Sequence, residues 1–256
     1  MEFLEIQGAR VPKIGLGTWN MRGDACYQGT LSALELGYRH IDTAEMYRNE
    51  AEVGRAIADS KVDRSEIFLT TKVSAAHLRY DGVLEAAESS LQRLSLETID
   101  LYLVHWPNEN IPINETMAGM NKLVERGRVR RIGVSNFSVP ELQEAEAAST
   151  ARIFTNQIEY FIAHPEQAML RYCQENDVLL TAYSPLNRGH LRSSPALSTI
   201  AEAHDVTIMQ VALRWLIQQE NVVAIPKSAD AGRQQENLDI FGFEISPDEL
   251  AQLDSA

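Results

Sequence analysis

The stretch HIDTAEMYRNE, residues 40–50, begins as an apolar strand and ends as the start of a helix. The strand pattern runs through Ile41 and stops at the carboxylate of Asp42, and the phenol of Tyr47 follows in the next loop. A buried strand that ends on a carboxylate needs a reason, because charged groups are seldom buried without a partner. The rest of the chain shows whether other strands end in the same way.

Eight short, β-branched apolar runs alternate with stretches of helical periodicity. Near-continuous apolar runs are typical of parallel strands that are covered on both faces. Eight strand–helix units in 256 residues predict a single α/β domain, a (β/α)8 TIM barrel over residues 1–256. The predicted strands are residues 14–19, 40–44, 67–73, 99–106, 131–136, 154–160, 178–184 and 222–226.

The first segment, FLEIQGARVPKIG, predicts a β-hairpin that turns near Gln7 and Gly8 and closes the barrel floor. The sequence also predicts several helix boundaries. The capping pairs are Asn49 with Glu52 and Thr207 with Gln210, Ser246-Pro247 with Glu249 is a third start signal, and Gly37 and Gly127 stand where helices should end.

The alternative fold is an open doubly wound sheet that binds a dinucleotide. It needs a glycine-rich loop after the first strand, and Gly15-Leu16-Gly17 supplies only part of one. Asn20 stands where the third glycine would be, and an isolated G-x-G is a weak signal. The sequence therefore favours the barrel.

Charge and composition exclude several classes of protein. The net charge of −13 argues against a nucleic-acid binder, which needs clustered Lys and Arg. No apolar run is long enough to span a bilayer, and the N-terminus shows no secretory signal. Cys26 and Cys173 lack metal-ligand spacing, so we expect no metal and two reduced thiols in a cytoplasmic protein. We also expect a monomer.

Polar or aromatic residues close nearly every predicted strand. In a barrel, the functional face is the carboxyl end of the strands, so these side chains should gather on one rim. They are Trp19, Asp42, Lys72, His105, Ser135, Asn136, Gln157, Tyr183, Lys227 and Ser228.

Three of these groups, Asp42, Lys72 and His105, form a proton-donor site together with Tyr47. Taken singly, Asp42 could cap a turn, Lys72 could be a solvated strand end, and His105 could be a core histidine. Taken together, Asp42 would hold Lys72 charged, and Lys72 would lower the pKa of the Tyr47 phenol. A neutral His105 imidazole would polarise a carbonyl oxygen that awaits the proton.

A phenol that protonates a carbonyl oxygen implies a nucleophile at the carbonyl carbon. The sequence shows no nucleophilic Ser or Cys arrangement and no pair of carboxylates of the glycosidase kind on the rim. The electron donor is therefore expected to be a cofactor.

The chain resembles the aldo-keto reductase family of NAD(P)H-dependent (α/β)8 oxidoreductases, including compact microbial members similar to 2,5-diketo-gluconic acid and methylglyoxal reductases. The resemblance runs along nearly the whole chain. Its motifs are GLGTW at 15–19, D-T-A-x-x-Y-x-N-E at 42–50, TTK at 70–72, LVHWP at 103–107, GVSNF at 133–137, NQIEY at 156–160, AYSPL at 182–186 and IPKS…R..EN at 225–237.

The resemblance implies a catalytic tetrad of Asp42, Tyr47, Lys72 and His105, with Tyr47 as the general acid. It implies that NADPH is the cofactor and that NADH binds more weakly. Tyr183 would stack on the nicotinamide, and Ser135, Asn136 and Gln157 would bind its carboxamide. Lys227, Ser228 and Arg233 would hold the 2′-phosphate, with Glu236 and Asn237 near the adenine, and Thr18, Ser184 and Leu186 would complete the cofactor site.

The chain also departs from the family pattern. Val73-Ser74-Ala75 follows Lys72, where the family often has a tryptophan, and the sequence ends at Ala256 without the long tail of many relatives. Trp19 and Trp106 would then line a shallow, open mouth. This predicts broad use of small aldehydes, ketones or dicarbonyls.

Two other functions are compatible with the sequence. One is a redox-sensing regulatory subunit that binds NADPH with little turnover. The other is a barrel aldolase with Lys72 as a Schiff base, which needs a neutral lysine that Asp42 would oppose. The expected function is NADPH-dependent reduction of a carbonyl to an alcohol, with the hydride from nicotinamide and the proton from Tyr47.

Overall fold

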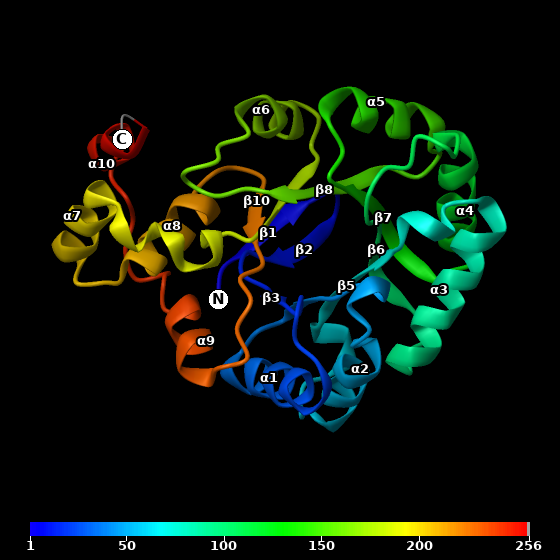
Figure 1. The fold of residues 1–256 in the computed structure, drawn as a ribbon, viewed down its shortest axis with the longest axis horizontal. Coiled ribbons are helices and arrows are strands. Elements are labelled where there is room, and N and C mark those ends of the chain that lie inside the picture. Colours follow the sequence, from blue (N-terminus) through cyan, green and yellow to red (C-terminus); the bar gives the residue numbers. More distant parts are fainter. Residues whose placement is uncertain (255–256) are drawn as a thin grey trace.

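The computed structural model describes residues 1–254, and its centre is a curled sheet of eight parallel strands (Figure 1). The strands lie side by side in their order along the chain. They are β3 (Leu16–Gly17), β4 (His40–Asp42), β5 (Phe68–Val73), β6 (Ile99–Val104), β7 (Val129–Ser135), β8 (Ile153–Glu159), β9 (Leu179–Tyr183) and β10 (Val222–Ala224).

Hydrogen bonds join the two edges of this sheet. The amide of Gly15 donates to the carbonyl of Ala224 (2.9 Å), the amide of Gly17 donates to Pro226 (3.1 Å), and the amide of Ala224 donates to Lys13 (2.9 Å). Ile14 and Ala224 form a parallel bridge. The fold is therefore TIM-barrel-like, as predicted, and the open doubly wound alternative is wrong.

Each of the eight predicted strands overlaps an observed one. All of the observed strands except β5 stop earlier than predicted at their carboxyl ends, so that Trp19 and Trp106 lie in loops beyond β3 and β6. The apolar run that predicts a strand therefore continues into the loop that forms the rim.

Ten α-helices lie outside the sheet in the part of the chain that the structure describes (Figure 1). They are α1 (Gly23–Leu36), α2 (Glu50–Asp59), α3 (Tyr80–Leu94), α4 (Ile113–Glu125), α5 (Val139–Ala148), α6 (Gln167–Glu175), α7 (Pro195–His204), α8 (Ile208–Ile217), α9 (Ala231–Leu238) and α10 (Pro247–Asp254). Short 3-10 turns are η1 (Glu45–Tyr47), η2 (Arg64–Glu66), η3 (Ala75–His77) and η4 (Asn187–Ser193).

Most of the predicted helix boundaries are confirmed. Thr207 and Gln210 form a reciprocal capping box at α8, and the amide of Ser246 donates to the Glu249 carboxylate (2.7 Å) at α10. Gly37 ends α1 in the left-handed conformation with φ 105°, and Gly127 follows α4 with φ 67°. These positive φ values favour glycine.

The predicted capping pair of Asn49 with Glu52 is wrong. Asn49 is the N-cap residue of α2, but its side chain makes no capping hydrogen bond. Its amide donates instead to the carbonyls of Thr18 (2.9 Å) and Met21 (3.0 Å), in the loop after β3. The sequence pattern of a cap is the same for both uses, so the pattern alone does not distinguish them.

The N-terminal hairpin forms as predicted from β1 (Phe3–Ile6) and β2 (Ala9–Pro12). Gln7 and Gly8 make its turn with φ of 46° and 71°, the two positive values of a type I′ turn. Ile6, Ala9 and Val11 pack in one buried cluster with strand residues of the sheet, including Phe68, Leu101 and Phe154.

Both cysteines, Cys26 and Cys173, are buried and unpaired, which confirms the expected free thiols. Among residues 1–254, no helix is long and apolar enough to cross a membrane. In the same residues, no group of three or more His, Cys, Asp and Glu side chains is placed to hold a metal ion.

Candidate active site

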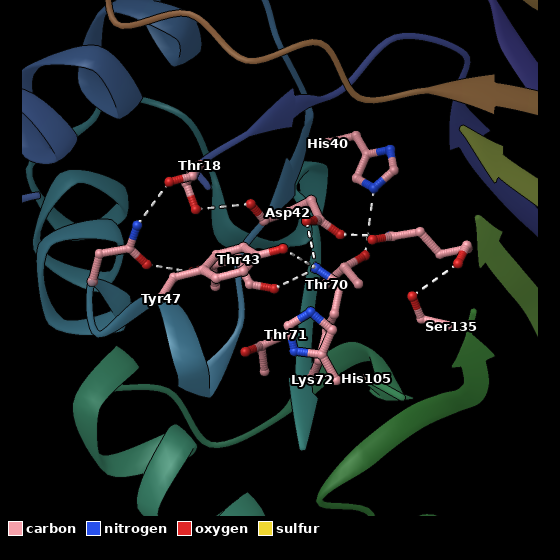
Figure 2. Close-up of polar contacts among 12 residues, drawn as sticks. Thr18, His40, Asp42, Thr43, Tyr47, Thr70, Thr71, Lys72, His105 and Ser135 are labelled. Atoms are coloured by element: carbon pink, nitrogen blue, oxygen red, sulfur yellow. Dashed lines mark hydrogen bonds and ion pairs between the residues drawn. The ribbon is translucent and has the colours of Figure 1, made fainter. Parts of the chain in front are cut away.

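The side chains of Asp42, Tyr47, Lys72 and His105 come together at the carboxyl ends of three neighbouring strands (Figure 2). Asp42 is the last residue of β4, Lys72 lies near the end of β5, and His105 directly follows β6. Tyr47 ends the turn η1, which follows β4. The structure therefore brings together the four residues that the sequence singled out.

Lys72 is the centre of this group. Its ammonium donates to Asp42 Oδ1 (2.6 Å), to the carbonyl of Thr43 (2.9 Å) and to the hydroxyl of Tyr47 (3.4 Å). The side chain is fully buried, and that of Asp42 is 2% exposed. Burial opposes the charge on Lys72, but the pKa of the ammonium is still raised because Asp42 and Tyr47 favour the charged form. Lys72 is therefore a charged ammonium and not a neutral nucleophile, which argues against the aldolase.

Tyr47 differs from the expectation in one respect. Burial raises the pKa of the phenol, and the charge of Asp42 raises it further. The charge of Lys72 lowers the pKa, as expected, but does not outweigh burial, so the net direction predicted from the sequence is wrong. The consequence is a phenol that keeps its proton at neutral pH.

His105 lies edge-on to Tyr47, with ring centroids 5.6 Å apart. Burial, and then the charge of Lys72, lower the pKa of His105 to about 3. The imidazole is therefore neutral near pH 7. Its Nδ1 atom is buried and has no hydrogen-bond partner within residues 1–254.

The loop that carries Tyr47 is held by polar contacts that the sequence did not predict. Thr43 donates to the Asn49 side chain (2.7 Å), which in turn binds the carbonyl of Thr18. Glu45 accepts the amide of Ser74 (2.9 Å) and pairs with His77 (2.8 Å). The motif at residues 42–50 contains Thr43, Glu45 and Asn49, and its spacing was the one available signal.

A second polar group lies beside the tetrad on β7, β8 and β9. Gln157 donates to Asp42 Oδ2 (2.8 Å), and Ser135 donates to the carbonyl of Gln157 (2.8 Å). Tyr183 donates to Asn136 Oδ1 (2.8 Å), and the Asn136 amide donates to the carbonyl of His105 (3.1 Å). These four predicted residues are therefore brought together, and Gln157 holds the second oxygen of Asp42.

The remaining residues expected near a cofactor spread along the same rim. Thr18 is buried and donates to the carbonyl of Asp42 (2.9 Å). Ser184 follows β9 with φ 50°, and Leu186 is half-buried in the loop after it.

The predicted phosphate site lies after β10. Lys227 is exposed, and Ser228 is buried beside it. Arg233 lies 3.7 Å from the carboxylate of Asp230, which caps α9 by accepting the amide of Arg233. Lys227 makes no ion pair with any residue that the structure describes, so it is the freer of the two cations.

The two residues expected near an adenine differ in their surroundings. Asn237 is buried in α9. Glu236 is half-buried and accepts a hydrogen bond from Thr207 (2.7 Å) at the start of α8. Its carboxylate is thus already engaged with another helix.

Large apolar side chains are exposed around the tetrad. Trp19 is 50% exposed, Trp106 47% and Met46 56%. The guanidinium of Arg188 lies 5.3 Å from the centre of the Trp19 ring. Met46 and Arg188 were not singled out from the sequence, because neither follows directly from the end of a strand.

Comparison with known proteins decides the family. A family model described as the Aldo/keto reductase family matches residues 13–256. The chain belongs to the aldo/keto reductase family. This aldo/keto reductase is 39% identical to the glyoxal reductase of Bacillus subtilis, over 97% of the chain and 90% of that protein.

Solved structures of other reductases are similar over more than nine-tenths of their length. One is a thermostable aldo-keto reductase in complex with the inhibitor epalrestat, with a TM-score of 0.96, 39% identity, and coverage of 100% of this chain and 99% of that chain. Another is a putative 2,5-diketo-D-gluconic acid reductase B, with a TM-score of 0.97, 38% identity, and coverage of 100% and 91%. The aldo/keto reductase described here is thus an oxidoreductase that acts on carbonyl groups.

Proposed function

We propose that this chain reduces aldehydes, ketones or dicarbonyls to alcohols with NADPH, and that Tyr47 donates the proton. One observation carries the proposal: the buried Lys72 ammonium lies between the Asp42 carboxylate and the Tyr47 hydroxyl. A carboxylate, an ammonium and a phenol in series favour transfer of the phenolic proton, because the ammonium stabilises the phenolate that is left behind.

Each residue of the tetrad has a separate role in this proposal. Tyr47 is a neutral phenol, so it holds the proton that the carbonyl oxygen receives. His105 is neutral, so its imidazole can orient and polarise the same oxygen without competing for the proton. Asp42 holds Lys72 charged and in place, and Gln157 fixes Asp42 from the other side.

A nicotinamide cofactor supplies the hydride when it is bound. The donor set on the rim fits such a group, since Ser135, Asn136 and Gln157 carry the hydroxyl and amide groups that suit a carboxamide, and Tyr183 offers a partly exposed ring. Further along the rim, Thr18, Ser184 and Leu186 would contact the cofactor. Lys227, Ser228 and Arg233 would hold a 2′-phosphate, and Glu236 and Asn237 would lie near the adenine.

The free charge of Lys227 supports NADPH over NADH as the preferred cofactor. Lys227 is exposed and has no acidic partner among residues 1–254, and such an ammonium can neutralise a phosphate at little desolvation cost. Arg233 is already beside Asp230, so its contribution should be smaller.

The substrate class follows from the rim and from a relative. Trp19 and Trp106 border the site and are about half exposed, which suits small carbonyl compounds held with little enclosure. The similar protein from Bacillus subtilis is named a glyoxal reductase, so glyoxal-like dicarbonyls are the first substrates to test.

The experiment measures NADPH consumption by the purified chain with glyoxal, methylglyoxal, simple aldehydes and keto-sugars, and repeats each assay with NADH. We expect turnover with NADPH, fastest with the small dicarbonyls. Tight binding of NADPH without turnover of any carbonyl would contradict the reductase and support a redox sensor. Absence of NADPH binding would contradict both.

We also propose that the hairpin closes the barrel floor, that residues 1–256 fold as one domain, and that the protein is a cytoplasmic monomer. Residues 255 and 256 lie outside the described part of that range. The packing of Ile6, Ala9 and Val11 with strand residues supports the first proposal. A single unfolding transition would support one domain, and a light-scattering mass of one chain would support a monomer.

A further inference from the structure

A cavity of 330 Å³ lies at the opposite end of the barrel from the tetrad. Its lining includes Gln7 of the hairpin turn, Arg130 and Arg131 near the start of β7, and Arg152 just before β8. These residues precede or begin parallel strands, whereas the tetrad lies where the strands end. The cavity is therefore separate from the carbonyl site.

Arg131 is the unusual residue of this cavity. Its side chain is half-buried, and its guanidinium makes no hydrogen bond or ion pair within residues 1–254. The contact that it does make is with the ring of Phe154, whose centre lies 5.3 Å from the guanidinium carbon. Burial lowers the pKa of Arg131, although a guanidinium stays charged in proteins. The charge of Asp100 opposes this lowering, but in the described chain Asp100 makes its ion pairs with Arg64 and Arg130 and not with Arg131. A half-buried charge without a direct ion pair is costly.

The acidic side chains nearby are already shared with other arginines. Asp100 binds Arg64 (2.6 Å) and lies 3.4 Å from Arg130. Asp177 pairs with Arg152 (3.1 Å). The arginines around the cavity therefore outnumber its carboxylates, in a chain whose net charge is −13. A local positive excess in an acidic protein favours an anionic ligand.

We propose that this cavity binds a small oxyanion of the phosphate class, held by the guanidinium of Arg131 and flanked by Arg130 and Arg152. The planar guanidinium can donate two parallel hydrogen bonds to two oxygens of such an anion, so the contact is directional as well as electrostatic. A water molecule occupies about 30 Å³ in the liquid, so the cavity has room for a phosphate and several waters.

The proposed site also lies where the hairpin meets the sheet. The side-chain amide of Gln7 donates to the carbonyls of Ile153 (3.1 Å) and Asp177 (2.6 Å), which tie the turn to the start of β8 and to the loop before β9. An anion held between these segments would bind the folded chain and not the unfolded one. Binding should therefore raise the stability of the folded state.

The test follows the midpoint of thermal unfolding of the whole chain, without NADPH, as inorganic phosphate replaces chloride at constant ionic strength. We expect phosphate to raise the midpoint of the wild type by about 2–4 °C. Arg131→Met should remove the increase, because methionine keeps the apolar contact with Phe154 and loses the charge. Arg171→Met, a change of an exposed arginine on α6 outside the cavity, should leave the increase intact.

Two further variants distinguish this cavity from phosphate binding elsewhere on the chain. Phosphate could instead bind at the proposed cofactor-phosphate site, so the same measurement is made on Lys227→Ala. If the phosphate-induced rise of the midpoint survives in Arg131→Met and disappears in Lys227→Ala, the proposal is overturned. Arg152→Gln changes a side chain that is 62% exposed, so it should fold normally and show a reduced phosphate response even if Arg131→Met does not fold. The proposal is also overturned if phosphate raises the midpoint of Arg152→Gln and Arg131→Met as much as that of the wild type. It is overturned as well if phosphate and chloride have equal effects on the wild type.

Discussion

Lys72 and Arg131 are two cations inside the same barrel, and their surroundings are opposite. Lys72, at the carboxyl end of the strands, is fully buried and has three partners, among them Asp42 at 2.6 Å. Arg131, at the amino end, is only half-buried and contacts an aromatic ring but no acid in the described chain. The deeper charge is the better compensated one.

The difference lies in how each charge is compensated. A fully buried ammonium persists only with a carboxylate beside it, and the resulting pair acts on the neighbouring phenol of Tyr47. A half-buried guanidinium can persist without an acid because part of it still reaches solvent. The first arrangement fits the proposed proton transfer, and the second fits the proposed anion site.

The largest effect on stability is expected from Lys72→Met. The change leaves the buried Asp42 carboxylate without its cation, so the free energy of unfolding should fall by about 3–5 kcal/mol. The double change Asp42→Asn with Lys72→Met removes both charges and should recover much of that loss without restoring turnover. Denaturant unfolding of the two variants is the measurement, and equal stabilities would mean that the pair is not compensated as described.

A smaller effect is expected from Lys227→Ala, a change of an exposed cation. Loss of a charge-assisted hydrogen bond should weaken NADPH binding by about 1.5–3 kcal/mol and change NADH binding little. Arg233→Ala should have a smaller effect on NADPH, since Arg233 is already beside Asp230. Titration of both cofactors measures this, and equal losses for NADPH and NADH would show that the phosphate site lies elsewhere.

Acid should destabilise the protein in part through His105. Its pKa in the folded chain is about 3, below the ordinary value of 6.5, so the unfolded chain takes up a proton first as the pH falls. Stability from this group is present above about pH 6.5 and is lost as the pH falls toward 3. The buried His40, whose pKa is lowered to about 4 by burial, acts in the same direction.

His105→Gln should therefore weaken this pH dependence. Between pH 7 and pH 5, we expect the wild type to lose roughly 1–2 kcal/mol more than the variant in free energy of unfolding. A variant that loses as much stability as the wild type would show that His105 is not held neutral.

The smallest effect is expected from Arg131→Met in a buffer without phosphate. Because Arg131 makes no ion pair in the described chain and interacts with Asp100 only at longer range, removing its charge should change the free energy of unfolding by no more than about 0.5 kcal/mol. If denaturant unfolding shows that Arg131→Met loses several kcal/mol in free energy of unfolding, as Lys72→Met is expected to, the two cations do not differ as described.

Much of the fold and the tetrad could be predicted from the sequence, because the signal is repeated. Each parallel strand is an apolar run that ends on a polar group, and the barrel places all such ends on one rim. Asp42, Lys72 and His105 could be grouped on that basis alone. The strand ends were placed too late at Trp19 and Trp106, because an exposed tryptophan has the same apolar character as a buried one.

Other features depend on contacts between distant residues. The sequence around Asn49 has the pattern of a helix cap, but the Asn49 side chain donates instead to the carbonyls of Thr18 and Met21. The direction of the Tyr47 pKa depends on how deeply the ring is buried, which no local pattern gives. The sequence predicts Arg131 at the start of a strand, and its spacing from Ser135 places both side chains on one face of β7. Its contact with the Phe154 ring depends on the neighbouring strand and has no local signal.

The most direct test of the central claim compares Tyr47→Phe with Tyr183→Phe in carbonyl reduction and in NADPH affinity. Both changes remove one phenolic hydroxyl from the same site, but only the Tyr47 hydroxyl accepts a hydrogen bond from the Lys72 ammonium. We predict that Tyr47→Phe loses reduction by a factor of about 10²–10⁴ while binding NADPH nearly as well as the wild type, and that Tyr183→Phe keeps most of its turnover. Reduction at a near-normal rate by Tyr47→Phe would show that the proton comes from another group.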